Sequence, residues 1–103
     1  MAGAKRKVTK KTIKPGGDIV ASMSGDFRKK LLTIVKSGIK DLTIDLAGVA
    51  MVDSVGLGVL IATHNSLEDV GGSIRLKNVS KDICHLIKTM RLDQYFQITP
   101  VEG

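Results

Sequence analysis

Aromatic residues, cysteine and long apolar runs are all scarce in this sequence. Only 3% of the residues are aromatic, so a hydrophobic core has to be built from Leu, Ile and Val. The single cysteine, Cys84, cannot form an internal disulfide, which agrees with a reducing compartment. No apolar run approaches the ~18 residues that a membrane-spanning helix needs, and no apolar stretch typical of a signal peptide stands near the N-terminus. These features predict a cytoplasmic protein that uses no membrane.

The residues that are present are ordinary for one small globular domain. The chain has 103 residues, of which 43% are apolar and 25% are charged. That length favours a single domain, and the apolar share is enough for one core. We therefore look for one folded unit without internal repeats.

The net charge of +6 is concentrated at the N-terminal end. Six basic residues lie between Lys5 and Lys14 with no acidic residue among them, whereas the chain from Pro15 onward carries ten basic and ten acidic residues. A basic arm can bind phosphate backbones or an acidic partner, but it more often serves as a solvated end. We divide the chain into a basic arm, residues 1–16, and a domain, residues 17–103. Nucleic acid is the weaker partner hypothesis, because the domain is neutral and has few aromatics for stacking.

Strand-like and helix-like hydrophobic patterns alternate along the chain. Short alternating segments indicate half-buried strands, and apolar residues at helical spacing separate them. This order predicts an α/β fold with a small sheet, mostly parallel in its later part, packed against helices. The expected strands span residues 8–13, 42–46, 73–77 and 95–98, a short extended segment spans 18–23, and the expected helices span 24–38, 54–69 and 80–90.

Metal, hydrolytic and phosphate-loop sites lack support in the residues. The two histidines lie on different expected helices, and Cys84 next to His85 has no usual metal-ligand spacing. Ser54 superficially resembles the nucleophile of a Gly-x-Ser-x-Gly elbow, but Val52 stands where the first glycine is needed. Residues 56–58 lack the third glycine and the following Lys-Ser/Thr of a phosphate-binding loop. We expect no metal, no cofactor and no catalytic residue.

The start of the expected helix at Ser54 carries the remaining functional signal. Serine is among the best N-cap residues because its oxygen accepts an unpaired backbone N–H. A phosphate on Ser54 would instead lie at the positive end of the helix dipole, where it disturbs the fold little. Gly56 and Gly58 leave the first turn bare, either for close packing on the sheet or for the approach of another protein. From these residues alone, a capping role is the simpler interpretation and a phosphorylation switch is the alternative.

Three separate segments follow a shared pattern. Residues 42–58 read LTIDLAGVAMVDSVGLG, residues 71–80 read GGSIRLKNVS and residues 90–98 read MRLDQYFQI. In this order they resemble the STAS domains of bacterial anti-sigma factor antagonists, in which a hydrophobic strand leads to Asp-Ser-Ser/Thr-Gly-Leu-Gly at a helix start. The resemblance covers residues 17–99 and implies that family's fold, a small mixed β-sheet with helices largely on one face.

The resemblance also implies a switch that works by binding and not by catalysis. By resemblance, Ser54 is phosphorylated by a partner serine kinase that is also the anti-sigma factor. The unphosphorylated protein would bind this kinase and free the sigma factor, phosphorylation would break the complex, and a PP2C-type phosphatase would restore it. Sigma-factor-dependent transcription would be regulated in this way. The docking residues implied by the match are Asp53, Ser54, Val55, Gly56, Leu57 and Gly58.

The sequence departs from the family pattern in places. Val55 stands where Ser or Thr is usual, so Ser54 is the only hydroxyl of the signature. An early Gly-Glu-Leu-Asp turn is replaced by residues 17–20, GDIV, and the basic arm has no counterpart in the family. The alternative function is a STAS scaffold or ligand-sensing module in a signalling assembly without a phosphorylation cycle. The oligomeric state is left open.

Overall fold

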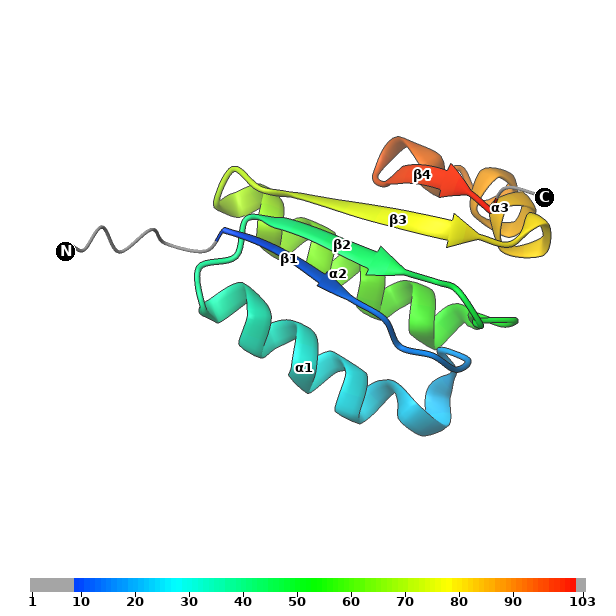
Figure 1. The fold of residues 1–103 in the computed structure, drawn as a ribbon, viewed down its shortest axis with the longest axis horizontal. Coiled ribbons are helices and arrows are strands. Elements are labelled where there is room, and N and C mark those ends of the chain that lie inside the picture. Colours follow the sequence, from blue (N-terminus) through cyan, green and yellow to red (C-terminus); the bar gives the residue numbers. More distant parts are fainter. Residues whose placement is uncertain (1–8, 102–103) are drawn as a thin grey trace, which may run out of the picture.

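Strands and helices alternate through residues 9–101, the part of the chain that the computed structural model describes (Figure 1). This order confirms the predicted α/β fold. The strands are β1 (Lys10–Ile13), β2 (Asp41–Asp45), β3 (Ser73–Val79) and β4 (Gln97–Pro100). The helices are α1 (Ser24–Lys36), α2 (Ser54–Asp69) and α3 (Lys81–Thr89), with short 3-10 turns η1 (Ala21–Met23) and η2 (Leu92–Gln94).

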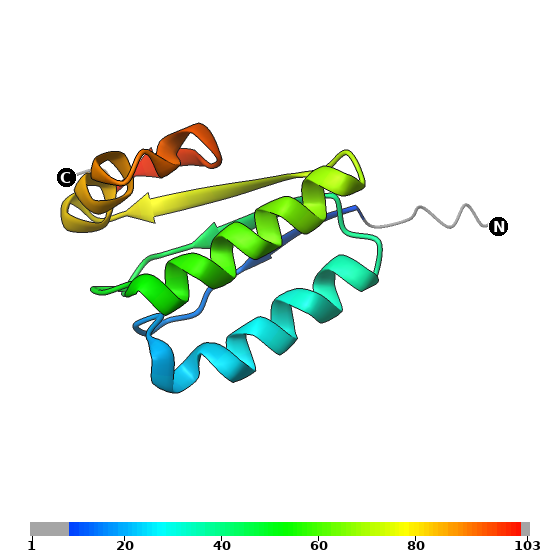
Figure 2. The same ribbon diagram turned by 180° about the vertical axis from the view of Figure 1, so that it is seen from behind.

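The strands lie in the sheet in their sequence order, β1-β2-β3-β4. Each neighbouring pair among these strands is parallel, so within the described residues the sheet is parallel and not mixed. The cause is the alternating order itself, because each helix returns the chain to the amino end of the next strand. Figure 2 shows α2 lying across the strands with α1 beside it, whereas α2 lies behind the strands in the view of Figure 1.

The core lies between the sheet and these two helices. Strand β2 buries every second residue, as half-buried strands do, and β3 does so as far as Leu76. The register then shifts between Lys77 and Val79, and Val79 is buried. The core is aliphatic, as the composition predicts, and Phe27 and Phe96 are the aromatic members that the described residues contribute. Its fully buried members include Leu31, Leu42, Ile44, Leu60, Leu67, Ile74 and Leu76.

Element boundaries follow the sequence prediction closely, with two differences: residues 21–23, predicted to be part of an extended segment, form the 3-10 turn η1, and the last strand begins later than predicted. Ser80 caps α3 as its residue type suggests, since its hydroxyl oxygen accepts the backbone N–H of Ile83 at 3.3 Å. The last strand, however, begins only at Gln97. Arg91 adopts a left-handed φ of 59° and leads into η2, so the chain turns once more before it enters the sheet. None of the helices in the described part of the chain is long and apolar enough to cross a membrane.

Strand β1 lies at one edge of the sheet and carries two lysines of the basic arm, Lys10 and Lys11. Its residues Lys10–Ile13, which the sequence analysis places within the arm, pair with β2 from Lys10 opposite Asp41 to Ile13 opposite Ile44. Lys10 and Lys11 are exposed, as expected for an edge strand that lysines protect from further pairing. Residues 1–8 of the arm lie outside the described residues.

Candidate functional site

Helix α2 begins at the end of the loop that leaves the carboxyl end of β2. Asp53 is its N-cap, with an extended backbone and a carboxylate Oδ1 that accepts the backbone N–H of Gly56 at 2.8 Å. Ser54 is the first residue of the helix, it is exposed, and its hydroxyl forms no hydrogen bond with any described residue. The interpretation of Ser54 as the N-cap is therefore wrong, because the preceding residue, Asp53, caps the helix.

Asp53 also joins α2 to a loop that lies 32 residues earlier in the sequence. Its second oxygen, Oδ2, accepts the backbone N–H of Ala21 at 2.9 Å. In return, Asp18 Oδ1 accepts the backbone N–H groups of Ala50 at 2.9 Å and Met51 at 3.1 Å. Each loop thus supplies one carboxylate that accepts backbone N–H groups of the other loop, and the two loops fix each other in place.

Ile19 completes this connection through its main chain. Its N–H donates to the carbonyl oxygen of Met51 at 2.9 Å, and its carbonyl oxygen accepts the N–H of Asp53 at 3.2 Å. Ile19 and Val52 form a single parallel bridge outside the main sheet. The start of α2 is consequently held in a defined position, which leaves the outward side of its first turn as a preformed surface.

These hydrogen bonds set the ionisation of Asp53. The backbone N–H of Gly56, and after it that of Ala21, lower the pKa of the Asp53 carboxyl because both stabilise the charged form. Asp53 therefore carries a negative charge directly before Ser54 at neutral pH. This charge already complements the positive end of the α2 dipole.

The two glycines of the signature have different surroundings. A Cβ placed on Gly56 would collide with the carbonyl oxygen of Ile19 and lie 2.9 Å from its Cγ2. Around Gly58, nothing lies within 4 Å of the same position. Gly56 therefore serves packing inside the protein, against the β1–α1 connection, whereas Gly58 leaves an open place on the surface.

The six predicted docking residues separate into an inner and an outer group. Gly56 and Leu57 are buried and Asp53 is used as the cap, so Ser54, Val55 and Gly58 form the outer group. We call this outer group the Ser54 surface. Val55 is 45% exposed, which is high for an apolar side chain.

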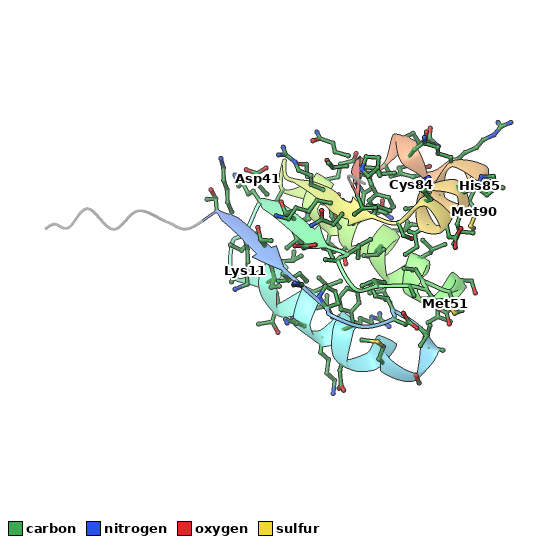
Figure 3. All side chains as sticks on the ribbon, turned by 45° about the vertical axis from the view of Figure 1, so that its right-hand side comes forward. Lys11, Asp41, Met51, Cys84, His85 and Met90 are labelled. Carbon is green, nitrogen blue, oxygen red and sulfur yellow. The ribbon has the colours of Figure 1, made fainter. Side chains whose placement is uncertain are left out.

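Sequence reasoning missed two residues beside this surface. Met51 is 56% exposed on the loop before α2, and Figure 3 shows it at the edge of the molecule. Ser22, in η1, is exposed and lies next to Ala21, whose N–H is bound to Asp53. Met51 could have been found, because it is a large apolar residue in the loop segment between Val49 and Val52. Ser22 gave none, because a contact across 32 residues leaves no mark in local sequence.

The remaining reactive side chains lie elsewhere. His64 is ten residues along α2 from Ser54, about 15 Å at the helical rise, and its ring packs on Tyr95 with a centroid distance of 5.3 Å. Cys84 is buried, and its thiol donates to the carbonyl oxygen of Val79 at 3.7 Å. Among residues 9–101, no group of three or more His, Cys, Asp or Glu side chains could hold a metal ion.

Comparison with known proteins shows which family the sequence matches. The sequence profile of the STAS domain family matches residues 4–103. The anti-sigma-B factor antagonist of Bacillus subtilis (strain 168) is 32% identical over 83 residues, which are 81% of this chain and 75% of that protein. That relative is a regulator and not an enzyme, which confirms the expectation that this chain is not an enzyme.

Solved structures show the same fold at lower identity. A candidate anti-sigma factor antagonist from Thermotoga maritima superposes with a TM-score of 0.84 at 20% identity, over 88% of this chain and 79% of that one. The antagonist SpoIIAA in its unphosphorylated form gives 0.77 at 17% identity, over 94% and 84%. SpoIIAA of Bacillus, a cell fate determinant, in its phosphorylated form gives 0.71 at 17% identity, over 94% and 87%. With the family profile covering nearly the whole sequence, this chain belongs to the STAS domain family.

Proposed function

We propose that this chain is a cytoplasmic anti-sigma factor antagonist that is switched by phosphorylation of Ser54. Unphosphorylated, it binds an anti-sigma factor that is also a serine kinase, and so frees the sigma factor. Phosphorylation of Ser54 by that kinase releases it, and a PP2C-type phosphatase restores the binding form. The relative of 32% identity is named as an antagonist of this kind, and SpoIIAA, which shares the fold, is known in both phosphorylation states.

One observation carries the proposal, namely that the Ser54 hydroxyl is exposed and has no structural task. Asp53 caps the helix, so Ser54 can be modified without the loss of a hydrogen bond that the fold needs. The site is also accessible, because it lies on the outward side of a helix start. A kinase can therefore act on the folded protein.

The surroundings of Ser54 explain how a phosphate could break a complex. Val55 is apolar and Gly58 is bare, so a docked partner excludes water from Ser54. A phosphate adds about two negative charges at pH 7. Asp53 is already ionised next to it and already uses the N–H of Gly56, so the fold offers the new charge little compensation. Burial of such a charge against a partner without a counter-ion costs several kcal/mol.

The phosphorylation step is tested with purified proteins. The chain is incubated with ATP and each serine-kinase anti-sigma factor of its source organism, and the product is analysed by intact and peptide mass spectrometry. We expect one phosphate, on the peptide that contains Ser54. Ser22→Ala is the matched control, because Ser22 is an exposed hydroxyl residue next to Ala21 in the loop network and its loss should leave the phosphorylation unchanged. Phosphate on another residue, or none with a kinase that binds, would contradict the proposal.

Two substitutions at Ser54 test the switch. Ser54→Ala should keep the affinity for the kinase and abolish release by ATP, and its thermal stability should match that of the wild type because Ser54 is not the cap. Ser54→Asp should weaken the complex. If Ser54→Asp binds as tightly as Ser54→Ala, and ATP leaves the affinity of the wild type unchanged, the STAS scaffold without a phosphorylation cycle is favoured instead.

A further inference from the structure

A shallow groove between α1 and α2 continues the Ser54 surface along the outside of the molecule. It has a volume of about 150 Å³ and lies between residues of both helices. On α2, Val59 and Ala62 follow Val55 and Gly58 by four residues each, which places them on the same side of the helix. We call this hollow the α1–α2 groove. It is lined by Arg28, Leu32 and Val35 of α1 and by Val59, Ala62 and Ser66 of α2.

Helix α2 offers the groove an uncharged side. It contains no Lys or Arg, and its first acidic residue is Glu68, near its end. Val55, Gly58 and Ala62 are all exposed on its outward side. Since a surface helix normally turns charged residues to water, an outward side without them is typical of a helix that meets a partner.

Helix α1 offers an apolar side chain among cations. Leu32 is 43% exposed. Arg28 stands four residues before it, Lys29 three before and Lys36 four after, so the three cations are its neighbours on the helix surface. In the part of the chain from residue 9 to 101, no Lys or Arg forms an ion pair with a carboxylate. The cations around Leu32 are therefore available to a partner.

The positive charge around the groove reflects an uneven distribution of charge between the first and the later part of the described chain. Residues 9–40, which form β1 and α1, contain eight basic and two acidic residues. Residues 41–101 contain five basic and seven acidic residues. The basic excess that remains in the described chain thus lies on the first strand and helix, at the edge of the molecule where α1 lies in Figures 1 and 2.

We propose that the anti-sigma factor covers the α1–α2 groove as well as the Ser54 surface, and that it does so with a segment that is apolar at its centre and acidic at its rim. The inference rests on the proposed function and names the chemistry of that partner. A standard interface buries about 800 Å² on each side, far more than Ser54, Val55 and Gly58 can offer. Extension along the groove supplies apolar contact from Leu32 and Val59, and the basic rim selects an acidic counterpart.

The charge distribution argues against two other occupants. A second copy of this chain, related by a two-fold axis, would bring one α1 close to the other and set cations against cations. An anionic membrane would attract the cations, but Leu32 is the only large apolar side chain that α1 exposes strongly, and stable attachment to a membrane needs more buried apolar surface than that.

The apolar centre is tested with Leu32→Gln, which keeps the helix propensity. The affinity of each variant is measured by calorimetry against the purified anti-sigma factor kinase that binds the wild type. We expect the affinity to fall about tenfold, the loss typical of an apolar contact at the centre of an interface. Val70→Gln is the matched control, since Val70 is similarly exposed, at 47%, but lies at the far end of α2. It should bind as the wild type does.

The basic rim is tested with the double variant Arg28→Glu and Lys29→Glu. We expect weaker and slower association, and an affinity that depends less on salt than that of the wild type. Lys10→Glu with Arg75→Glu is the control with the same change in charge, because both residues line a hollow over the strands, away from the α1–α2 groove. This control should keep the salt dependence of the wild type.

The outcomes separate this inference from the proposed function. If Leu32→Gln and the double variant both bind with affinities within about twofold of the wild type, the anti-sigma factor does not cover the α1–α2 groove. The proposed phosphorylation of Ser54 would be unaffected by that result. Failure of the wild type to bind any anti-sigma factor kinase would overturn both. Binding to phosphatidylserine vesicles that is lost in the double variant would assign the basic rim to a membrane and would also overturn the inference.

Discussion

Gly56 and Gly58 lie two positions apart in the sequence, but their surroundings in the structure are opposite. Gly56 faces the backbone of Ile19, and Gly58 faces open surroundings. Glycine costs roughly 1 kcal/mol relative to alanine inside a helix, and the reason for accepting that cost is different at each position. At Gly56 it is internal packing, and at Gly58 we propose that it is the surface presented to a partner.

Alanine at each position separates these two reasons. Gly56→Ala should destabilise the fold by about 1–3 kcal/mol, because the new methyl group has to displace the main chain at Ile19. Gly58→Ala should stabilise it by up to about 1 kcal/mol through helix propensity, while weakening the complex with the anti-sigma factor. Denaturant unfolding and calorimetry measure the two effects. A stable Gly56→Ala protein would show that the close approach to Ile19 is not needed.

Asp53 makes the stability of the fold depend on pH. Its pKa is lowered in the folded state, so its stabilising contribution is present above the pKa of the unfolded chain and is lost as the pH falls through the folded value. The loss therefore occurs at acidic pH, below about 4. Asp53→Asn keeps a good cap but removes the charge. Thermal melts should show a shallower fall in stability on acidification for Asp53→Asn than for the wild type, and parallel curves would contradict this account.

At the scale of elements, the start of α2 depends on a connection that local sequence does not show. The boundaries of α2 and the cap of α3 can be predicted, because hydrophobic spacing and capping residues are local signals. The contacts of Asp18 with Ala50 and Met51, and of Asp53 with Ala21, join residues more than 30 positions apart. They become visible only when the sheet brings β1 and β2 together. Ser54 could be taken for the cap for a different, local reason: Asp and Ser are about equally good N-cap residues, so the adjacent pair leaves the choice open until the bond from Gly56 to Asp53 is known.

Asp18→Ala tests the link between the two loops. Without the Asp18 carboxylate, the backbone N–H groups of Ala50 and Met51 lose their acceptor. We expect hydrogen exchange at these two amides to accelerate by roughly an order of magnitude. The amide of Leu46, which donates to Lys77 in the sheet, should be unaffected and is the internal control. Unchanged exchange at Ala50 and Met51 would show that other contacts hold the loop.

At the scale of the whole molecule, the topology of the sheet determines where the start of α2 lies. The parallel strands place every strand-to-helix loop of this kind at one end, where the carboxyl ends of strands in α/β folds commonly carry function. The Ser54 surface lies there, on a helix start fixed by two carboxylates. The composition predicts a basic arm and a neutral body, and a count along the chain shows that residues 9–40 carry a basic excess. The structure adds that β1 and α1, which these residues form, lie together at one edge of the molecule.

The most direct test of the central claim compares two forms of one protein. The chain is prepared unphosphorylated and fully phosphorylated at Ser54, and each form is titrated by calorimetry into the same anti-sigma factor kinase. We predict that the unphosphorylated form binds and that the phosphorylated form binds about two orders of magnitude more weakly, because a dianion cannot be buried unpaired against a partner. Equal affinities of the two forms would contradict the account.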